Sequence, residues 1–291
     1  MTRCLTDSMK GLAKAFLQSK EVIRSGAGIF AIALLVFLNP STGYSESFLS
    51  RFPHGEEALF PEGSLHYEVA DGDMTKPGLL FIHGSPGEWE DWKSFMGNTD
   101  LKGFGFRLSV DRPGFGHSKK MGLLGLRREA EIFSRLIPPG EKVVVVGHSM
   151  GAPIAVWMAI DHPEKVLAAV SVAGSLSSQR ELPRWYNRLA EWPVIRNLLP
   201  PEFITSNREM MQLSSQLKEL EQALPRLKVP VLLVQGSKDF LVEPATVDDW
   251  EKLGVGAPLR IDRLKGEDHF LHWRHPSRLV GILESLIKEN F

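Results

Sequence analysis

The sequence predicts an α/β fold with a mostly parallel, doubly wound sheet and a small helical cap insertion. Three observations carry this prediction. From about residue 64 onward, short apolar runs alternate with helical patterns. Several of these runs are apolar throughout and end in glycine, and residues 175–225 hold helical patterns alone. Strands that alternate with helices of this length are typical of a parallel sheet covered on both faces.

Seven apolar runs are the strand candidates. The run "GLLFIHG" (78–84) shows why they are strands buried on both faces, because it has no polar alternation before its terminal histidine and glycine. The predicted strands are 65–69, 78–84, 106–111, 142–147, 167–174, 229–236 and 258–264.

Helical patterns fill the intervals between these strands. Their lengths suit the right-handed crossovers that join parallel strands. The predicted helices are Trp89–Gly97, Leu123–Leu136, Met150–Ile160, Thr246–Leu253 and Pro276–Glu289.

The interval 175–225 interrupts the alternation. It contains two helical patterns separated by the helix-breaking "LLPP" at 198–201. Because a strand pattern resumes at 229, we expect an insertion over one end of the sheet rather than a separate domain.

Composition narrows the classes of function. The chain has 291 residues and a formal net charge of −1. Lys and Arg are not clustered in the way a nucleic-acid surface requires, so no nucleic-acid partner is expected. The only cysteine is Cys4, so disulfides are not expected to stabilise the domain.

Residues 1–45 differ from the rest of the chain. Five basic residues outnumber the two acidic ones there, and an uncharged stretch, Gly26–Leu38, follows them. These 13 residues suit the core of a signal peptide and are short for a membrane span. Small residues at Ser41 and Gly43 suit a signal peptidase. We expect an exported chain, periplasmic or secreted, with a domain over 46–291.

Two alternatives for this segment stay open. An uncleaved segment would anchor the protein to a membrane. An ordinary N-terminal helix would neither direct export nor anchor the protein. Translation could begin at Met1 or at Met9, which would shorten the basic region.

The tripeptide Gly-His-Ser occurs twice, ending at Ser118 and at Ser149. Ser149 lies in "GHSMG", after four valines and before the helical pattern "APIAVWMAI". A strand, a sharp turn and a helix in this order would expose the serine hydroxyl above the sheet edge. Ser118 lies in a glycine-rich loop followed by two lysines. We therefore predict Ser149 as the nucleophile.

A serine nucleophile needs a base and an acid that orients the base. Asp239 follows the predicted strand 229–236, and His269 follows the next one. Functional groups gather at the carboxyl ends of parallel strands, so these side chains could meet Ser149. Glu243 and Asp268 are alternatives for the acid.

The chain from about 64 to 291 resembles α/β-hydrolase-fold enzymes with a helical cap. The resemblance rests on four motifs in order: "HGSPG" (83–87), "DRPGFGHS" (111–118), "GHSMG" (147–151), and "GSKD" together with "DHFLHWRHP". The order serine, aspartate, histidine is that of the family. The seven-residue spacing from His269 to Pro276 is also a family feature, and it selects His269 over the histidines at 272 and 275.

The resemblance implies further site residues. The backbone N–H groups of Ser85 and Met150 would form the oxyanion hole, because the family takes one donor from each of these loops. Candidate substrate-binding residues are Trp89, His148, Phe240 and Phe270. His83 and His148 are also candidates for purely structural roles. No cofactor and no metal site are expected, because no carboxylate pair completes a ligand set for the three histidines of "HFLHWRH".

These expectations favour a serine hydrolase that cleaves an ester or related acyl bond of a small, apolar substrate. The family's dehalogenase and epoxide-hydrolase members use an aspartate nucleophile, where this chain has Ser149. Two alternatives keep the triad: a carbon–carbon-bond hydrolase, and an aminopeptidase similar to proline iminopeptidases, whose "HGGPG" resembles "HGSPG". A third is a non-catalytic binding protein on the same fold. Arg180, Arg184 and Arg188 could meet an anionic substrate, although a solvated helix face explains their spacing equally well.

Overall fold

An eight-stranded sheet organises the part of the chain that the computed structural model describes, residues 56–73 and 75–290. Its strand order is β1-β2-β4-β3-β5-β6-β7-β8. From β4 to β8 the neighbouring strands are parallel, whereas β2 is antiparallel to both β1 and β4. The strands are β1 (Glu56–Phe60), β2 (Gly63–Ala70), β3 (Gly78–Ile82), β4 (Arg107–Val110), β5 (Val143–His148), β6 (Val166–Val172), β7 (Val231–Gly236) and β8 (Leu259–Leu264).

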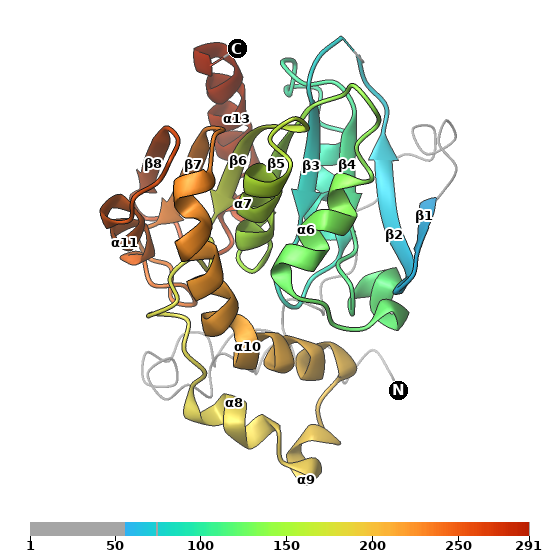
Figure 1. Cartoon of the computed structure of the whole chain (residues 1–291), viewed down its shortest axis with the longest axis vertical. Helices are drawn as coiled ribbons and strands as arrows, with labels where there is room; N and C mark the ends of the chain where they lie inside the picture. The colour runs from blue at the N-terminus through green and yellow to red at the C-terminus, as the bar shows by residue number, and fades with distance from the viewer. Residues whose placement is uncertain (1–55, 74, 291) are drawn as a thin grey trace, which may run out of the picture. The chain divides into compact units, whose positions relative to one another are not determined.

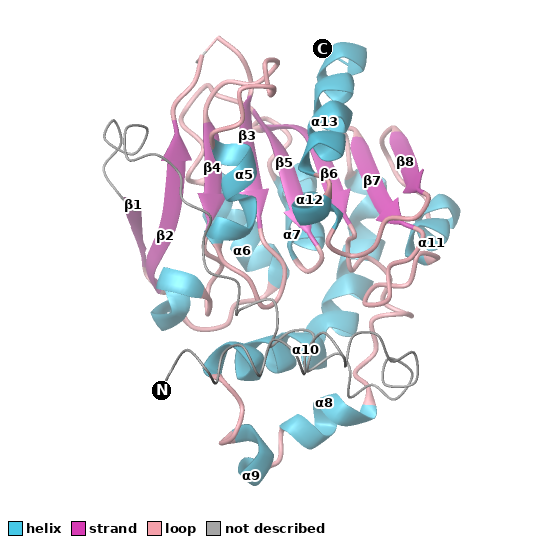
Figure 2. Cartoon of the chain, turned by 180° about the vertical axis from the view of Figure 1, so that it is seen from behind, coloured by secondary structure: helices cyan, strands magenta, loops and turns pink. Residues whose placement is uncertain are grey.

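Helices cover both faces of this sheet (Figures 1 and 2). One face carries α6, α7, α11 and part of α10, and the other carries α5, α12 and α13. The α-helices are α5 (Lys93–Met96), α6 (Leu126–Ser134), α7 (Gly151–Asp161), α8 (Trp185–Ala190), α9 (Pro193–Arg196), α10 (Pro201–Ala223), α11 (Thr246–Lys252), α12 (Leu271–Arg274) and α13 (Pro276–Asn290). The short 3-10 helices of the described residues are η1 (Trp89–Trp92), η2 (Gly116–Met121) and η3 (Leu224–Arg226). The predicted α/β fold class is confirmed.

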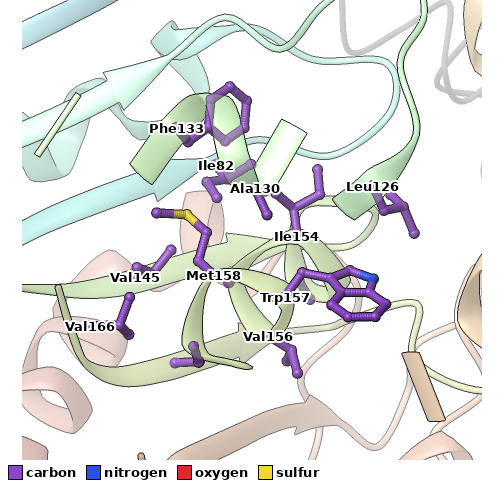
Figure 3. Packing of buried hydrophobic residues seen from close by; sticks show 14 of the residues in the cluster. Ile82, Leu126, Ala130, Phe133, Val145, Ile154, Val156, Trp157, Met158 and Val166 are labelled. Atoms are coloured by element: carbon purple, nitrogen blue, oxygen red, sulfur yellow. The ribbon is translucent and has the colours of Figure 1, made fainter. Parts of the chain in front are cut away.

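Two apolar cores result from the alternation of side chains along each strand. In β5, Val143 and Val145 belong to one core, while Val144 and Val146 belong to the other. All four side chains are fully buried. Figure 3 shows the first core, to which side chains of α6 such as Leu126 and side chains of α7 such as Trp157 both belong. Continuous apolar runs are therefore required, since each residue of such a strand faces a covering layer.

Each of the seven predicted strands and five predicted helices overlaps an observed element. The prediction missed β1, which among the described residues pairs with β2 alone and leaves Leu59 84% exposed. An edge strand of this kind needs no apolar run, so "EEALF" carries little hydrophobic signal. The segment after Ser118 was expected to be a loop, but Ser118 lies within the 3-10 helix η2.

Helices α8, α9 and α10 occupy the interval between β6 and β7, where the sequence predicts an insertion. α10 begins at Pro201, the last residue of the "LLPP" stretch, and Pro is well tolerated in the first turn of a helix. Its second half packs into the core through Leu213, Leu217 and Leu220. Its first half reaches away from the sheet toward α8 (Figure 1).

Residues 1–55 lie outside the described part of the chain, and with them the predicted signal peptide or anchor at 1–45. Within the described residues, no helix has the length and apolar character needed to span a bilayer.

The sheet has one point at which the strand order reverses. After β3 the chain crosses to β4 on one side, and after β4 it returns to β5 on the other side of β3. The loops that leave the carboxyl ends of β3 and β5 therefore diverge. In doubly wound sheets such a point forms the crevice in which ligands bind.

Candidate active site

Ser149 occupies the sharp turn between β5 and α7. Its φ is +51°, a left-handed conformation that is rare outside glycine. Its N–H donates a hydrogen bond to the carbonyl of Val172 at the end of the neighbouring strand β6 (3.0 Å). The turn thus carries the local backbone strain expected of a nucleophile elbow.

The two glycines of "GHSMG" make this turn sterically possible. A Cβ on Gly147 would lie 2.2 Å from the carbonyl oxygen of Gly151. A Cβ on Gly151 would lie 2.4 Å from the carbonyl oxygen of Ile82 in β3. Both distances are far below contact, so strand and helix can approach this closely only without side chains at these positions.

His269 and Asp239 form a hydrogen-bonded pair. Nδ1 of His269 lies 2.9 Å from Oδ2 of Asp239, and both side chains are almost fully buried. Asp239 also accepts hydrogen bonds from Gln235 and from the backbone N–H groups of Leu241 and Val242. A carboxylate with these donors accepts the Nδ1 proton of the imidazole, which leaves Nε2 as the basic nitrogen.

The alternatives for the acid are engaged elsewhere. Asp268 pairs with Arg274 at 2.6 Å, and Glu243 pairs with Arg180 at 2.6 Å. Of the three candidates, Asp239 is the one whose carboxylate meets the ring of His269.

Arg180 also binds Asp249, so its charge is already matched within the protein. Of the three arginines at a spacing of four, Arg180 is therefore not a free cation for an anionic substrate.

The loop after β3 approaches the nucleophile. A Cβ on Gly84 would lie 3.1 Å from Cβ of Ser149, so a side chain there would crowd the site. Among the described residues, neither the Ser85 amide nor the Met150 amide donates to another backbone carbonyl. Both are thus donors that a substrate oxygen could use, as an oxyanion hole requires.

His83 and Arg112 donate hydrogen bonds to the loop after β3. The N–H of Arg112 donates to Nε2 of His83 (2.9 Å), so the ring proton is on Nδ1 and donates to the carbonyl of Gly84 (2.7 Å). Burial and the nearby Arg112 guanidinium lower the pKa of His83 to about 3. His83 is therefore neutral, and its contacts are those of a structural residue.

Arg112 joins three segments in a fully buried ion cluster. It forms two hydrogen bonds to Glu129 of α6, a third to Glu209 of α10, and a fourth to the carbonyl of Gly84 (3.1 Å). No local sequence pattern reveals this cluster. Its only sequence signal is an arginine inside the "DRPG" stretch, because its two acidic partners are 17 and 97 residues away.

His148 and His272 pack beside the histidine of the pair. Nε2 of His148 donates to the carbonyl of His269 (3.0 Å), and the His148 and His272 ring centroids are 4.0 Å apart. Burial lowers the pKa of both His148 and His272 well below the usual range. These contacts favour a supporting role for His148 over the substrate contact that the sequence suggested.

The aromatic substrate-binding candidates divide into two groups. Phe270 stacks on Trp273 at 5.1 Å and contacts both His269 and Phe240, which is 37% exposed. Trp89 has different neighbours: its backbone N–H donates to Asp111, and Lys93 lies over its ring.

Glu181 is a buried carboxyl group that the sequence analysis missed. It is 7% exposed and lies in the insertion, where burial raises its pKa to about 7. The charge of Asp239 raises this pKa further, while His269, Arg184 and a hydrogen bond from Ser175 lower it. The N–H of Ser175 in turn donates to the carbonyl of Ser149 (3.1 Å), so Glu181 belongs electrostatically to the same site.

Comparisons with known proteins agree with this fold. A family model described as "alpha/beta hydrolase fold" matches residues 77–219. The chain is 25% identical over 244 residues to biotin biosynthesis bifunctional protein BioHC of Cellvibrio japonicus, covering 72% of this chain and 47% of that protein. It is 22% identical over 305 residues to epoxide hydrolase 3 of Xenopus tropicalis, covering 82% of this chain and 78% of that protein.

Solved structures show the same fold. The monoacylglycerol lipase of Paleococcus ferrophilus superposes with a TM-score of 0.60 at 21% identity, covering 77% of this chain and 98% of the lipase. At this identity the similarity concerns the fold alone.

The chain has the α/β-hydrolase fold, and its residues 77–219 match the family model of that description; lipases, esterases and epoxide hydrolases are among the proteins that it is similar to. It spans about half the length of the bifunctional relative.

Proposed function

We propose that the protein is a serine hydrolase that cleaves an ester or related acyl bond of a small molecule. One observation carries the proposal: Ser149 lies in a strained turn after β5, and the hydrogen-bonded pair of His269 and Asp239 follows β8 and β7 of the same parallel sheet. Because the carboxyl ends of these strands share one sheet edge, the three residues can act as a triad.

The proposed reaction uses an acyl-enzyme. The hydroxyl oxygen of Ser149 attacks the acyl carbon while Nε2 of His269 takes its proton, and Asp239 stabilises the imidazolium. The N–H groups of Ser85 and Met150 would bind the oxyanion. His269 then protonates the leaving group, and a water molecule activated by the same Nε2 releases the acid and restores Ser149.

The residue at the turn also separates this chemistry from that of epoxide hydrolases. Those family members attack with an aspartate, and this chain has Ser149 at the turn between strand and helix. Similarity to an epoxide hydrolase therefore supports the fold but not the same nucleophile.

An apolar acyl substrate fits the surroundings of the site. Phe240 is partly exposed beside Phe270, which contacts His269. Large exposed apolar side chains also gather on the insertion, namely Leu182, Trp185, Trp192, Val194, Leu198 and Met211. A solvated surface rarely carries so many, which supports contact with apolar material.

A fluorophosphonate probe tests the nucleophile. The wild-type protein should be labelled covalently, and Ser149→Ala should not be labelled, because the probe reacts with an activated serine. Ser118→Ala is the matched control from the second Gly-His-Ser and should be labelled like the wild type. The proposal fails if folded wild-type protein is not labelled, or if Ser149→Ala is labelled equally; the first result would favour a non-catalytic binding protein.

Substrate type separates the enzymes that share a triad. We expect release of p-nitrophenol from acyl esters and little cleavage of aminoacyl anilides. Faster turnover of proline anilides than of esters would instead indicate the aminopeptidase alternative.

A further inference from the structure

A second cluster of polar side chains lies on the β2 side of the sheet. It contains His66 of β2, Asp111 at the end of β4, and His117 of η2. One ligand atom from each residue lies within 4.8 Å of the other two. Nδ1 of His66 is 2.9 Å, and Nδ1 of His117 is 3.0 Å, from Oδ2 of Asp111. Among the described residues this is the one group of three such side chains close enough to share a metal ion.

The backbone around the cluster is built to hold these side chains together. The N–H of Asp111 donates to the carbonyl of His66 (3.0 Å), and the N–H of His66 donates to Oγ of Ser118 (2.8 Å). Gly116 has a φ of +48°, and a Cβ there would lie 2.4 Å from the carboxyl carbon of Asp111. In the Gly-His-Ser sequence at 116–118, Gly116 thus leaves space for the carboxyl group of Asp111. His117 supplies a ring nitrogen, and the hydroxyl of Ser118 holds the backbone of His66.

The carboxylate at the centre is fully buried. Asp111 accepts backbone N–H donors on both oxygens, from Trp89 on Oδ1 and from His117 on Oδ2. Such donors favour the ionised form, so the cluster holds a fixed negative charge.

The nitrogen of His66 is the informative atom. The side chain is 8% exposed, and its Nδ1 lies 2.9 Å from the carboxylate oxygen of Asp111. A ring nitrogen and a carboxylate oxygen this close together can bind the same metal ion. The other ring nitrogen of His66, Nε2, lies 3.6 Å from Glu68, the kind of outer carboxylate that orients a metal-binding histidine.

We propose that His66, Asp111 and His117 bind a divalent transition-metal ion, with Zn²⁺ as the best fit. Two imidazole nitrogens and one carboxylate oxygen are ligands that Zn²⁺ accepts, at bonds of about 2.0–2.2 Å. Tetrahedral bonds of that length place ligand atoms about 3.3 Å apart, which is close to the observed 2.9 and 3.0 Å to Asp111. Ligand atoms of the two histidines lie within 4.8 Å of each other. The His117 side chain is 67% exposed, which leaves solvent access for the ion and for a fourth, water ligand.

This site is separate from the proposed triad and does not depend on it. The ion would tie β2 and η2 to the end of β4, next to Arg112, which supports the loop after β3. Its expected role is structural, and it departs from the sequence-based expectation that the chain has no metal site.

Metal titration tests the proposal directly. The full chain, carrying Cys4→Ser to remove its only thiol, is stripped with a chelator and titrated with Zn²⁺ against a chromophoric competitor. We expect one equivalent to bind, and Co²⁺ to give the visible absorption of a four-coordinate site. His117→Ala removes an exposed ligand with little risk to folding and should weaken Zn²⁺ binding at least about 100-fold.

His275→Ala is the matched control. His275 is also an exposed histidine beside a carboxylate, 3.4 Å from Glu267, and its side chain is 56% exposed. This control should bind Zn²⁺ like the parent and show the same rise in melting temperature with Zn²⁺, whereas His117→Ala should show no rise. The proposal is overturned if the parent binds no stoichiometric Zn²⁺, or if His117→Ala binds as tightly as His275→Ala; the cluster is then only a hydrogen-bonded structural group.

Discussion

Ser149 and Ser118 follow the same two residues but occupy different backbone conformations. Ser149 has a φ of +51° at the end of a fully buried strand. Ser118 is fully buried in η2, and its hydroxyl accepts the N–H of His66. The valines before Ser149 and the helical pattern after Gly151 distinguish the two serines in sequence. The contact of Ser118 with His66 has no local sequence signal, because the two residues are 52 positions apart.

Glu181 leads to a prediction about pH. Its pKa is raised from 4.5 to about 7, so the folded state holds this proton more tightly than the unfolded state does. The resulting stabilisation is complete below pH 4.5 and is lost as the pH rises through about 7; it amounts to at most about 3 kcal/mol. Glu181→Gln stays neutral and should lose this pH dependence, so its free energy of unfolding should rise relative to wild type between about pH 5 and pH 8.

Urea denaturation at several pH values measures this difference. Glu219→Gln is the control, because that side chain is 59% exposed on the same insertion, and its curve should stay parallel to wild type. Parallel curves for Glu181→Gln as well would show that the carboxyl titrates normally.

At the scale of elements, Arg112 connects α6, α10 and the loop after β3. Its guanidinium is the one positive partner that the described structure gives to the buried pair Glu129 and Glu209. Burial raises the pKa of Glu129 to about 7, with the charge of Glu209 acting in the same direction and Arg112 opposing it. Two buried carboxylates depend on one cation, so the insertion is linked to the sheet by charge as well as by the leucines of α10.

Arg112→Met should therefore destabilise the protein by about 3–5 kcal/mol, because it leaves buried carboxylates without a partner. Esterase turnover should also fall, since the carbonyl of Gly84 loses its donor. Urea denaturation and turnover of a p-nitrophenyl ester measure the two effects. Arg135→Met, which removes an exposed pair with Glu131, should cost less than about 1 kcal/mol; an equally small cost for Arg112→Met would contradict the proposed link.

At the scale of the whole molecule, the order of basic and apolar segments in residues 1–45 predicts export. Fractionation of cells and N-terminal sequencing of the mature protein test this prediction. We expect a mature chain that begins near Ser41 or Gly43 in an exported fraction. A membrane fraction with an intact N-terminus would indicate the anchor instead, and a cytoplasmic protein that starts at Met1 or Met9 would exclude both.

Much of the fold follows from local pattern. Runs such as Val143–Val146 identify central strands because both faces of the sheet are covered, and each residue must then be apolar. Strand β1 escaped the same reasoning because, within the described part of the chain, it pairs on one side only, so burial places little demand on its composition. The steric limit on Gly147 operates within five residues, because a Cβ there would meet Gly151, whereas the limit on Gly151 comes from Ile82 in the neighbouring strand.

The sequence by itself determined the α/β class, the turn that carries Ser149, and the candidates for its partners. Each of these depends on residues close together in the chain, where periodicity and steric limits act directly. The tertiary structure decided which carboxylate meets His269, how Arg112 joins two helices to the loop after β3, and that His66 lies beside Asp111 and His117. Those outcomes depend on strand order and register, which bring together residues that are 17 to 97 positions apart and whose local sequence carries no record of the partner.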